Sequence, residues 1–250
     1  MIDRHAHLLD SKFDDDRSAV IARLQEAGGI WIEVGTTLED SRRVLDFPYA
    51  SVGAHPNDIY GLTEKDWQEL ASLASNPHCC AIGEVGLDFS RDGVLTEQEE
   101  VLRRFIVLAQ EKKLPLIFHV RSGNGIDAHQ ELLRILKTYP ERPLGVIHTF
   151  GGTLSQAKEY ISLGMMISFS GVITFKNAGE LPEVATIIPL GSILVETDCP
   201  YLTPEPYRGM RNEPLYVKYV IQKIADFRRV SFEEIEKATE QNTRILFGLK

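Results

Sequence analysis

Apolar residues in this chain form short runs, and segments with helical periodicity separate these runs. The runs at 81–82, 116–118, 145–147 and 193–195 are continuous and do not alternate with polar residues. Strands that are covered on both faces have this pattern, which is typical of a buried parallel sheet. The candidate strands begin near Ile2, Ile30, Ser51, Cys80, Pro115, Leu144, Met165 and Ile193.

The segments between the runs carry helix signals. Apolar residues recur at i, i+3, i+4 and i+7 over 102–109 and again over 217–224, which predicts two amphipathic helices. Thr96 with Glu99, and Ser231 with Glu234, predict capping boxes at two helix starts. The proline-rich stretch 201–214 follows the last strand signal and predicts a long loop.

Eight strand signals that alternate with helices in 250 residues predict an α/β fold, a (β/α)8 TIM barrel. A doubly wound open sheet also alternates strands and helices, but it usually has only about five to seven strands. No linker-like or low-complexity stretch divides the sequence. We therefore expect residues 1–250 to form a single domain.

Composition narrows the class of protein. The chain has 27 Lys and Arg against 36 Asp and Glu, a formal net charge of −9, which argues against a broad basic surface that binds nucleic acid by counterion release alone. No apolar run approaches the roughly 18 residues of a membrane span, and the N-terminus does not resemble a signal peptide. Three cysteines indicate no disulfide framework. We expect a cytoplasmic monomer.

Histidine and acidic residues gather at the ends of the candidate strands. Five of the seven histidines lie at the C-terminal end of a strand or just beyond it. In a barrel these ends converge on one mouth, where active sites lie. The residues in such positions are His5, His7, His55, Glu84, His119, His148 and Asp198.

The residue types at the mouth suit metal binding. His5 and His7 are two apart, so on a strand both imidazoles point to the same side. Glu84 follows an apolar strand and could bridge two cations, whereas Asp198 could be a ligand, a general base or both. Each residue alone is more simply an ordinary core or rim residue. Together they indicate a two-metal hydrolytic site, with Mg, Mn or Zn all compatible.

Six ordered blocks of sequence carry a resemblance to a known family. They are 3–7 (DRHAH), 53–56 (GAHP), 83–88 (GEVGLD), 119–121 (HVR), 148–152 (HTFGG) and 196–202 (ETDCPYL). In this order the blocks resemble the signature of TatD-type metal-dependent deoxyribonucleases. The resemblance runs from residue 2 to about 248, because 208–214 and 242–247 match as well.

The resemblance implies a TIM barrel of the metal-dependent hydrolase type, a ligand set and an activity. His5, His7 and Asp198 would hold one divalent cation, His119 and His148 a second, and Glu84 would bridge the two. The family hydrolyses phosphodiester bonds of DNA, commonly from a 3′ end, so we expect a hydrolase that acts on ester bonds as a 3′–5′ exodeoxyribonuclease. Asp198 would take a proton from the attacking water, and His55 could contact the phosphate or the leaving group.

The expected partner is therefore DNA, as single strands or frayed 3′ ends. The candidate contacts to its backbone are the basic and amide side chains of the loops, because guanidinium groups match phosphate oxygens. They are Arg121, Lys176, Arg208, Arg211 and Asn212. The chain departs from the family pattern in a glycine-rich insertion at 122–126 and at Asn57, Thr149 and Gly151. These departures bear on substrate preference more than on chemistry.

Three other functions are compatible with the same residues. A metal-dependent amidohydrolase or esterase that cleaves a small amide, ester or lactone would use nearly the same ligands, and so would an enzyme that cleaves an aminoacyl-tRNA ester. A metal-binding protein without catalysis is the third alternative. The sequence leaves the native metal, the polarity of cleavage and the choice between DNA and RNA open.

Overall fold

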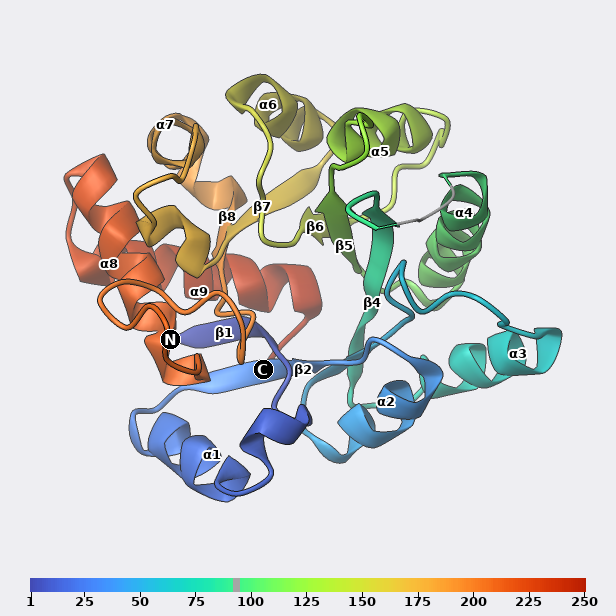
Figure 1. The fold of residues 1–250 in the computed structure, drawn as a ribbon, viewed down its shortest axis with the longest axis horizontal. Coiled ribbons are helices and arrows are strands. Elements are labelled where there is room, and N and C mark those ends of the chain that lie inside the picture. Colours follow the sequence, from blue (N-terminus) through green and yellow to red (C-terminus); the bar gives the residue numbers. More distant parts are fainter. Residues whose placement is uncertain (92–94) are drawn as a thin grey trace.

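The computed structural model describes residues 1–91 and 95–250, and within them eight parallel strands form one sheet with helices around it (Figure 1). The strand order follows the sequence from first to last, which confirms the predicted (β/α)8 barrel. The strands are β1 (Ile2–Ala6), β2 (Ile30–Val34), β3 (Ala50–Val52), β4 (Cys79–Asp88), β5 (Leu116–Arg121), β6 (Gly145–Ile147), β7 (Met165–Phe169) and β8 (Ile193–Val195).

Helices cover the outside of the sheet. They are α1 (Arg17–Glu26), α2 (Leu38–Arg43), α3 (Glu64–Leu73), α4 (Leu95–Lys112), α5 (Ala128–Leu136), α6 (Leu154–Ser162), α7 (Leu181–Ile187), α8 (Val217–Arg228) and α9 (Phe232–Phe247). Short 3-10 helices are η1 (Ser11–Phe13), η2 (Val44–Asp46), η3 (Gly171–Thr174), η4 (Leu190–Ser192) and η5 (Pro214–Tyr216). The described helices include none long and apolar enough to cross a bilayer.

The two predicted amphipathic helices are confirmed as α4 and α8, and their apolar residues are buried. Ser231 caps α9 by accepting a hydrogen bond from the backbone N–H of Glu234. The prediction for Thr96 is wrong: α4 already includes Leu95, so Thr96 lies inside the first turn of the helix. The loop predicted over 201–214 is confirmed, since it connects β8 to η5.

The barrel closes where β8 meets β1. Two backbone hydrogen bonds join these strands, from the N–H of His7 to the carbonyl of Cys199 at 2.9 Å and from the N–H of Asp198 to the carbonyl of His5 at 3.0 Å. The carboxylate of Asp3 adds a third link by accepting a hydrogen bond from the N–H of Thr197 at 2.8 Å. This seam places the ends of the first and last strands side by side.

The barrel interior is apolar in one layer and polar in the next layer toward the C-terminal ends of the strands. The apolar layer belongs to one buried cluster that includes Ile2, Ile117, Val146 and Leu194. Side chains two positions apart on a strand point the same way. Two residues after each of these apolar side chains, a polar side chain therefore points into the next layer of the interior. These residues are Arg4, His119, His148 and Glu196.

Strand β4 differs from the prediction, because Glu84 lies in the middle of it and not at its end. The pairing register between β4 and β5 shifts between Ile82 and Val85. Gly83 and Gly86 adopt φ angles of 152° and 155°, which only glycine tolerates easily. The irregular backbone brings Glu84 to the centre of the mouth while β4 continues to Asp88.

Candidate metal centre

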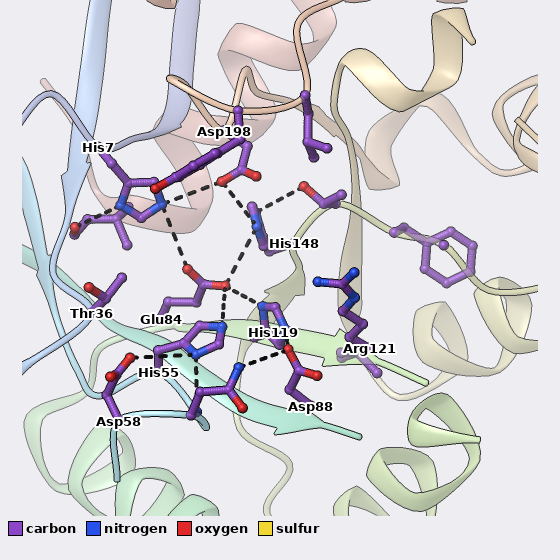
Figure 2. A pocket seen from close by; sticks show the side chains of 18 of the residues that line it. His7, Thr36, His55, Asp58, Glu84, Asp88, His119, Arg121, His148 and Asp198 are labelled. Atoms are coloured by element: carbon purple, nitrogen blue, oxygen red, sulfur yellow. Dashed lines mark hydrogen bonds and ion pairs between the residues drawn. The ribbon is translucent and has the colours of Figure 1, made fainter. Parts of the chain in front are cut away.

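All of the predicted histidines and carboxylates except the fully buried His5 line one cavity of about 900 Å³ at the mouth of the barrel. Figure 2 shows Glu84 at the centre, with His7, His148 and Asp198 on one side of it and His55 and His119 on the other. Glu84 is almost fully buried. The structure thus brings together residues from the first strand to the last.

The first group of donors lies where β1 meets the loop after β8. The Nε2 atoms of His5 and His7 face each other at 3.1 Å. One carboxylate oxygen of Asp198 lies 3.7 Å from the first of these atoms and 3.4 Å from the second. Glu84 completes the group, with Oε2 at 3.3 Å from Nε2 of His5.

The second group uses the other oxygen of the same carboxylate. Glu84 Oε1 lies 2.5 Å from Nδ1 of His119 and 3.7 Å from Nε2 of His148. Glu84 therefore faces both groups of donors at once, one oxygen toward each. This is the geometry that a carboxylate bridging two cations requires.

Three of the histidines have their second ring nitrogen engaged by a fixed acceptor. Nδ1 of His7 lies 3.2 Å from the carbonyl of Val34, and Nε2 of His119 lies 3.1 Å from Asp88. Nδ1 of His148 lies 2.9 Å from Glu196. Because the engaged nitrogen donates its proton to the acceptor, the other nitrogen of the neutral ring keeps a lone pair that faces the centre.

His55 has the opposite arrangement. Its Nδ1 accepts a hydrogen bond from the backbone N–H of Asn57 at 3.1 Å. The neutral ring therefore carries its proton on Nε2, which lies 4.0 Å from Glu84. Burial lowers the pKa of His55 to about 4, so the ring is neutral at pH 7. His55 can therefore donate a hydrogen bond from Nε2, and with Asp88 and His119 it also forms a set of three donor residues within 4.8 Å that could hold a cation.

Protons and cations compete for this site. Burial disfavours a charged ring at His7, but the hydrogen bond and charge of Asp198 outweigh it and raise the pKa to about 9. In the same way Asp88 and Glu84 overcome burial at His119 and raise its pKa to about 9. Burial lowers the pKa of His5 to about 4. A cation that binds here displaces protons from His7 and His119.

The donor set fits divalent cations. Several sets of three donor atoms lie within 4.8 Å of one another among the described residues, including His5–His7–Glu84, His5–His148–Asp198 and Glu84–His119–His148. Mixed imidazole and carboxylate donors suit Zn and Mn, and carboxylates extend the range to Mg. The chemistry of the side chains therefore agrees with a metal centre.

Of the basic residues predicted to contact substrate, Arg121 lines the cavity and lies at its edge, near His119 (Figure 2). Arg208 and Lys176 are not among the described residues that line it. The guanidinium of Arg208 packs over the ring of Phe175, at 3.6 Å from its centre. Arg121 alone of these three keeps its predicted position.

Arg211 and Asn212 stabilise the loop that follows β8 instead of facing the mouth. Arg211 forms two hydrogen bonds with the carboxylate of Asp16, both 2.7 Å long. Asn212 is fully buried, and its amide group donates to the carbonyls of Thr197 and Tyr201. Both side chains are engaged within this region of the fold, and neither is among the described residues that line the cavity.

The sequence analysis missed Asp88 and Glu196, which orient His119 and His148. A signal for both was present. Glu196 and Asp198 have the same two-residue spacing as His5 and His7, and Asp88 lies in the same block as Glu84. His129 also lines the cavity.

Comparison with known proteins gives consistent results. The chain is 40% identical to an uncharacterized metal-dependent hydrolase, YabD, of Bacillus subtilis, over 100% of this chain and 99% of the relative. It is 33% identical to a protein named 3′-5′ ssDNA/RNA exonuclease TatD of Klebsiella pneumoniae, over 100% and 98% of the two chains.

Solved structures agree. The TatD homologue YjjV of Escherichia coli superimposes with a TM-score of 0.91 at 31% identity, covering 100% of this chain and 98% of that one. An uncharacterized amidohydrolase of Saccharomyces cerevisiae shares the fold, with a TM-score of 0.83 at 17% identity over 98% and 99% of the chains. The family model described as TatD related DNase matches residues 2–248. The chain belongs to the TatD-related DNase family.

Proposed function

We propose that this protein is a metal-dependent 3′–5′ exonuclease that hydrolyses phosphodiester bonds of single-stranded DNA. The observation that carries the proposal is the position of Glu84, whose two oxygens face two separate groups of imidazole and carboxylate donors. The Klebsiella pneumoniae relative is named a 3′-5′ ssDNA/RNA exonuclease, which supports the substrate and the polarity.

Two divalent cations would complete the site, and they would neutralise charge on the phosphate and lower the pKa of a water molecule. We assign His5, His7 and Asp198 to one cation and His119 and His148 to the other, with Glu84 shared. The three histidines with engaged second nitrogens present the lone pairs that this assignment requires. The identity of the metals stays open among Mg, Mn and Zn.

The side chains of the site have separate tasks. The Asp198 carboxylate lies at the centre and is partly exposed, so it can accept a proton from an attacking water. His55 carries a proton on Nε2 and can donate a hydrogen bond to the phosphate or to the leaving oxygen. Arg121, at the edge of the cavity, can pair with a neighbouring phosphate.

Other properties of the chain belong to the same proposal. The cysteines 79, 80 and 199 are free thiols, which suits a reducing cytoplasm. The large exposed apolar side chains come from different helices and loops, which favours a monomer that acts as one domain over residues 1–250.

The proposal is tested with metal-free protein and a 5′-labelled single-stranded oligonucleotide, to which Mg, Mn or Zn is added in turn. We expect a ladder of products shortened from the 3′ end, and a loss of at least about 100-fold in rate for Asp198→Asn. Arg208→Gln serves as the matched control outside the cavity and should retain activity. If metal binds but no ladder forms with any cation, the nuclease proposal is wrong, and small esters, amides and lactones become the substrates to test.

A further inference from the structure

Glu196 is a fully buried carboxylate directly behind the metal centre. Its Oε1 accepts two hydrogen bonds from Thr149, from the backbone N–H at 2.6 Å and from the hydroxyl at 2.8 Å. Nδ1 of His148 lies 2.9 Å from the same oxygen. The oxygen that faces His148 is therefore held in position by its neighbour in the chain.

The other oxygen is held from inside the barrel. Glu196 Oε2 accepts a hydrogen bond from Ser168 at 2.8 Å and forms an ion pair with Arg4. Arg4 is fully buried as well, and its Nε donates to the same Ser168 hydroxyl at 2.7 Å. A buried carboxylate without a partner would be costly at this depth, and Arg4 and Ser168 provide partners for Glu196.

The His148 ring is held on a second side. It stacks on the ring of His5, with 3.6 Å between the ring centres and 18° between the ring planes. Stacking limits the tilt of the ring, and the carboxylate oxygen 2.9 Å from Nδ1 favours the tautomer that carries its proton on Nδ1. Nε2 of His148 is then left to face Glu84 and Asp198 at 3.7 and 3.6 Å.

We propose that Glu196, fixed by Arg4 and Ser168, is a positioning residue that keeps His148 as a metal ligand and so sets the affinity of the second cation. The proposal rests on the proposed metal centre and extends it to a residue that touches neither metal nor substrate. Carboxylates behind metal-binding histidines typically change metal affinity by about 10–100-fold.

The experiment compares Glu196→Gln with Glu213→Gln by calorimetric titration of the metal-free proteins with Mn. Glu213 is the control, because it is a mostly buried carboxylate that pairs with Arg23 at 2.6 Å and is not among the described residues that line the cavity. We expect Glu196→Gln to weaken one of two Mn sites by about 10–100-fold. Glu213→Gln should leave both sites unchanged.

Equal Mn affinities at both sites in Glu196→Gln and the wild-type protein would overturn the proposal, even if the variant unfolds at a lower temperature. Should the variant fail to fold, nitrogen-15 NMR of histidine in the wild-type metal-free protein decides the question. We expect His148 to carry its proton on Nδ1, and a proton on Nε2 would overturn the proposal. Binding of two cations by the wild-type protein without DNA cleavage would refute only the nuclease function.

Discussion

At the scale of single residues, His129 shows how burial sets protonation outside the metal centre. The ring lies on α5, where Nδ1 is 3.3 Å from the hydroxyl of Tyr160, and that hydroxyl donates to the His129 carbonyl at 3.0 Å. Burial lowers the pKa of His129 to about 4. The folded protein therefore keeps this ring neutral where the unfolded chain would protonate it.

The consequence is a loss of stability in mild acid. Between pH 6.5 and 4 the unfolded state binds a proton at His129 that the folded state excludes, so the free energy of unfolding falls as the pH falls. At pH 5 the proton excluded from His129 has lowered the free energy of unfolding by about 2 kcal/mol relative to neutral pH. We expect His129→Gln to lose less stability than the wild-type protein between pH 7 and pH 5, measured by urea unfolding. Parallel curves for the two proteins would contradict this assignment.

Spacing on strands predicted residues of the metal centre better than residue type predicted substrate contacts. His5 and His7 face each other as the two-residue spacing on a strand predicts, and the same rule applied to Leu194 in β8 would have placed Glu196 in the next interior layer. Asn212 could not be placed in this way. Its hydrogen bonds to two carbonyls depend on how one loop folds back on itself, which no periodicity records.

At the scale of elements, the irregular strand β4 depends on glycine. A Cβ atom on Gly86 would lie 1.9 Å from the carbonyl oxygen of His119, and the φ angle of 155° disfavours any other residue. We expect Gly86→Ala to destabilise the protein by about 3 kcal/mol or more. Gly191→Ala is the matched control, since a Cβ there meets nothing within 4 Å.

Chemical denaturation of both variants checks this prediction. Gly191→Ala should unfold at the same urea concentration as the wild-type protein or slightly above it, because alanine restricts the unfolded chain. A Gly86→Ala protein as stable as this control would show that β4 and β5 can separate at little cost. The metal affinity of Gly86→Ala should fall as well, because Glu84 and His119 belong to these two strands.

The order and type of the elements followed from the sequence because buried parallel strands and amphipathic helices have distinct periods. Their boundaries followed less well. Thr96 resembles a helix cap but lies inside α4, and β4 continues past Glu84 to Asp88. The pairing of β4 with β5 shifts in register between Ile82 and Val85 and then continues to Asp88. A run of apolar residues does not reveal how a strand pairs with its neighbour.

At the scale of the whole molecule, the mouth is acidic like the rest of the chain. Seven of the described residues that line the cavity are Asp or Glu, and only two are arginines, at positions 91 and 121. Such a surface repels a phosphate chain unless cations are bound. Binding of nucleic acid should therefore require metal.

We expect the affinity for a single-stranded oligonucleotide with cleavage-resistant phosphorothioate linkages to fall at least tenfold when a chelator removes the metal. Fluorescence anisotropy with and without Mn, at one fixed ionic strength, measures this change. Arg121→Gln should weaken binding further in the presence of Mn, whereas Arg208→Gln should not. Binding that persists in the chelator would place the contact surface outside the mouth.

The seam between β8 and β1 gives the metal centre a second role. His5 and His7 lie on one side of this seam and Asp198 on the other, and only a few hydrogen bonds join the two sides. A cation shared by these three residues is a cross-link between the two ends of almost the whole chain. Since a ligand that binds only the folded state stabilises it, metal binding and folding of the barrel are thermodynamically linked. Removal of the metal would then destabilise the fold as well as abolish catalysis.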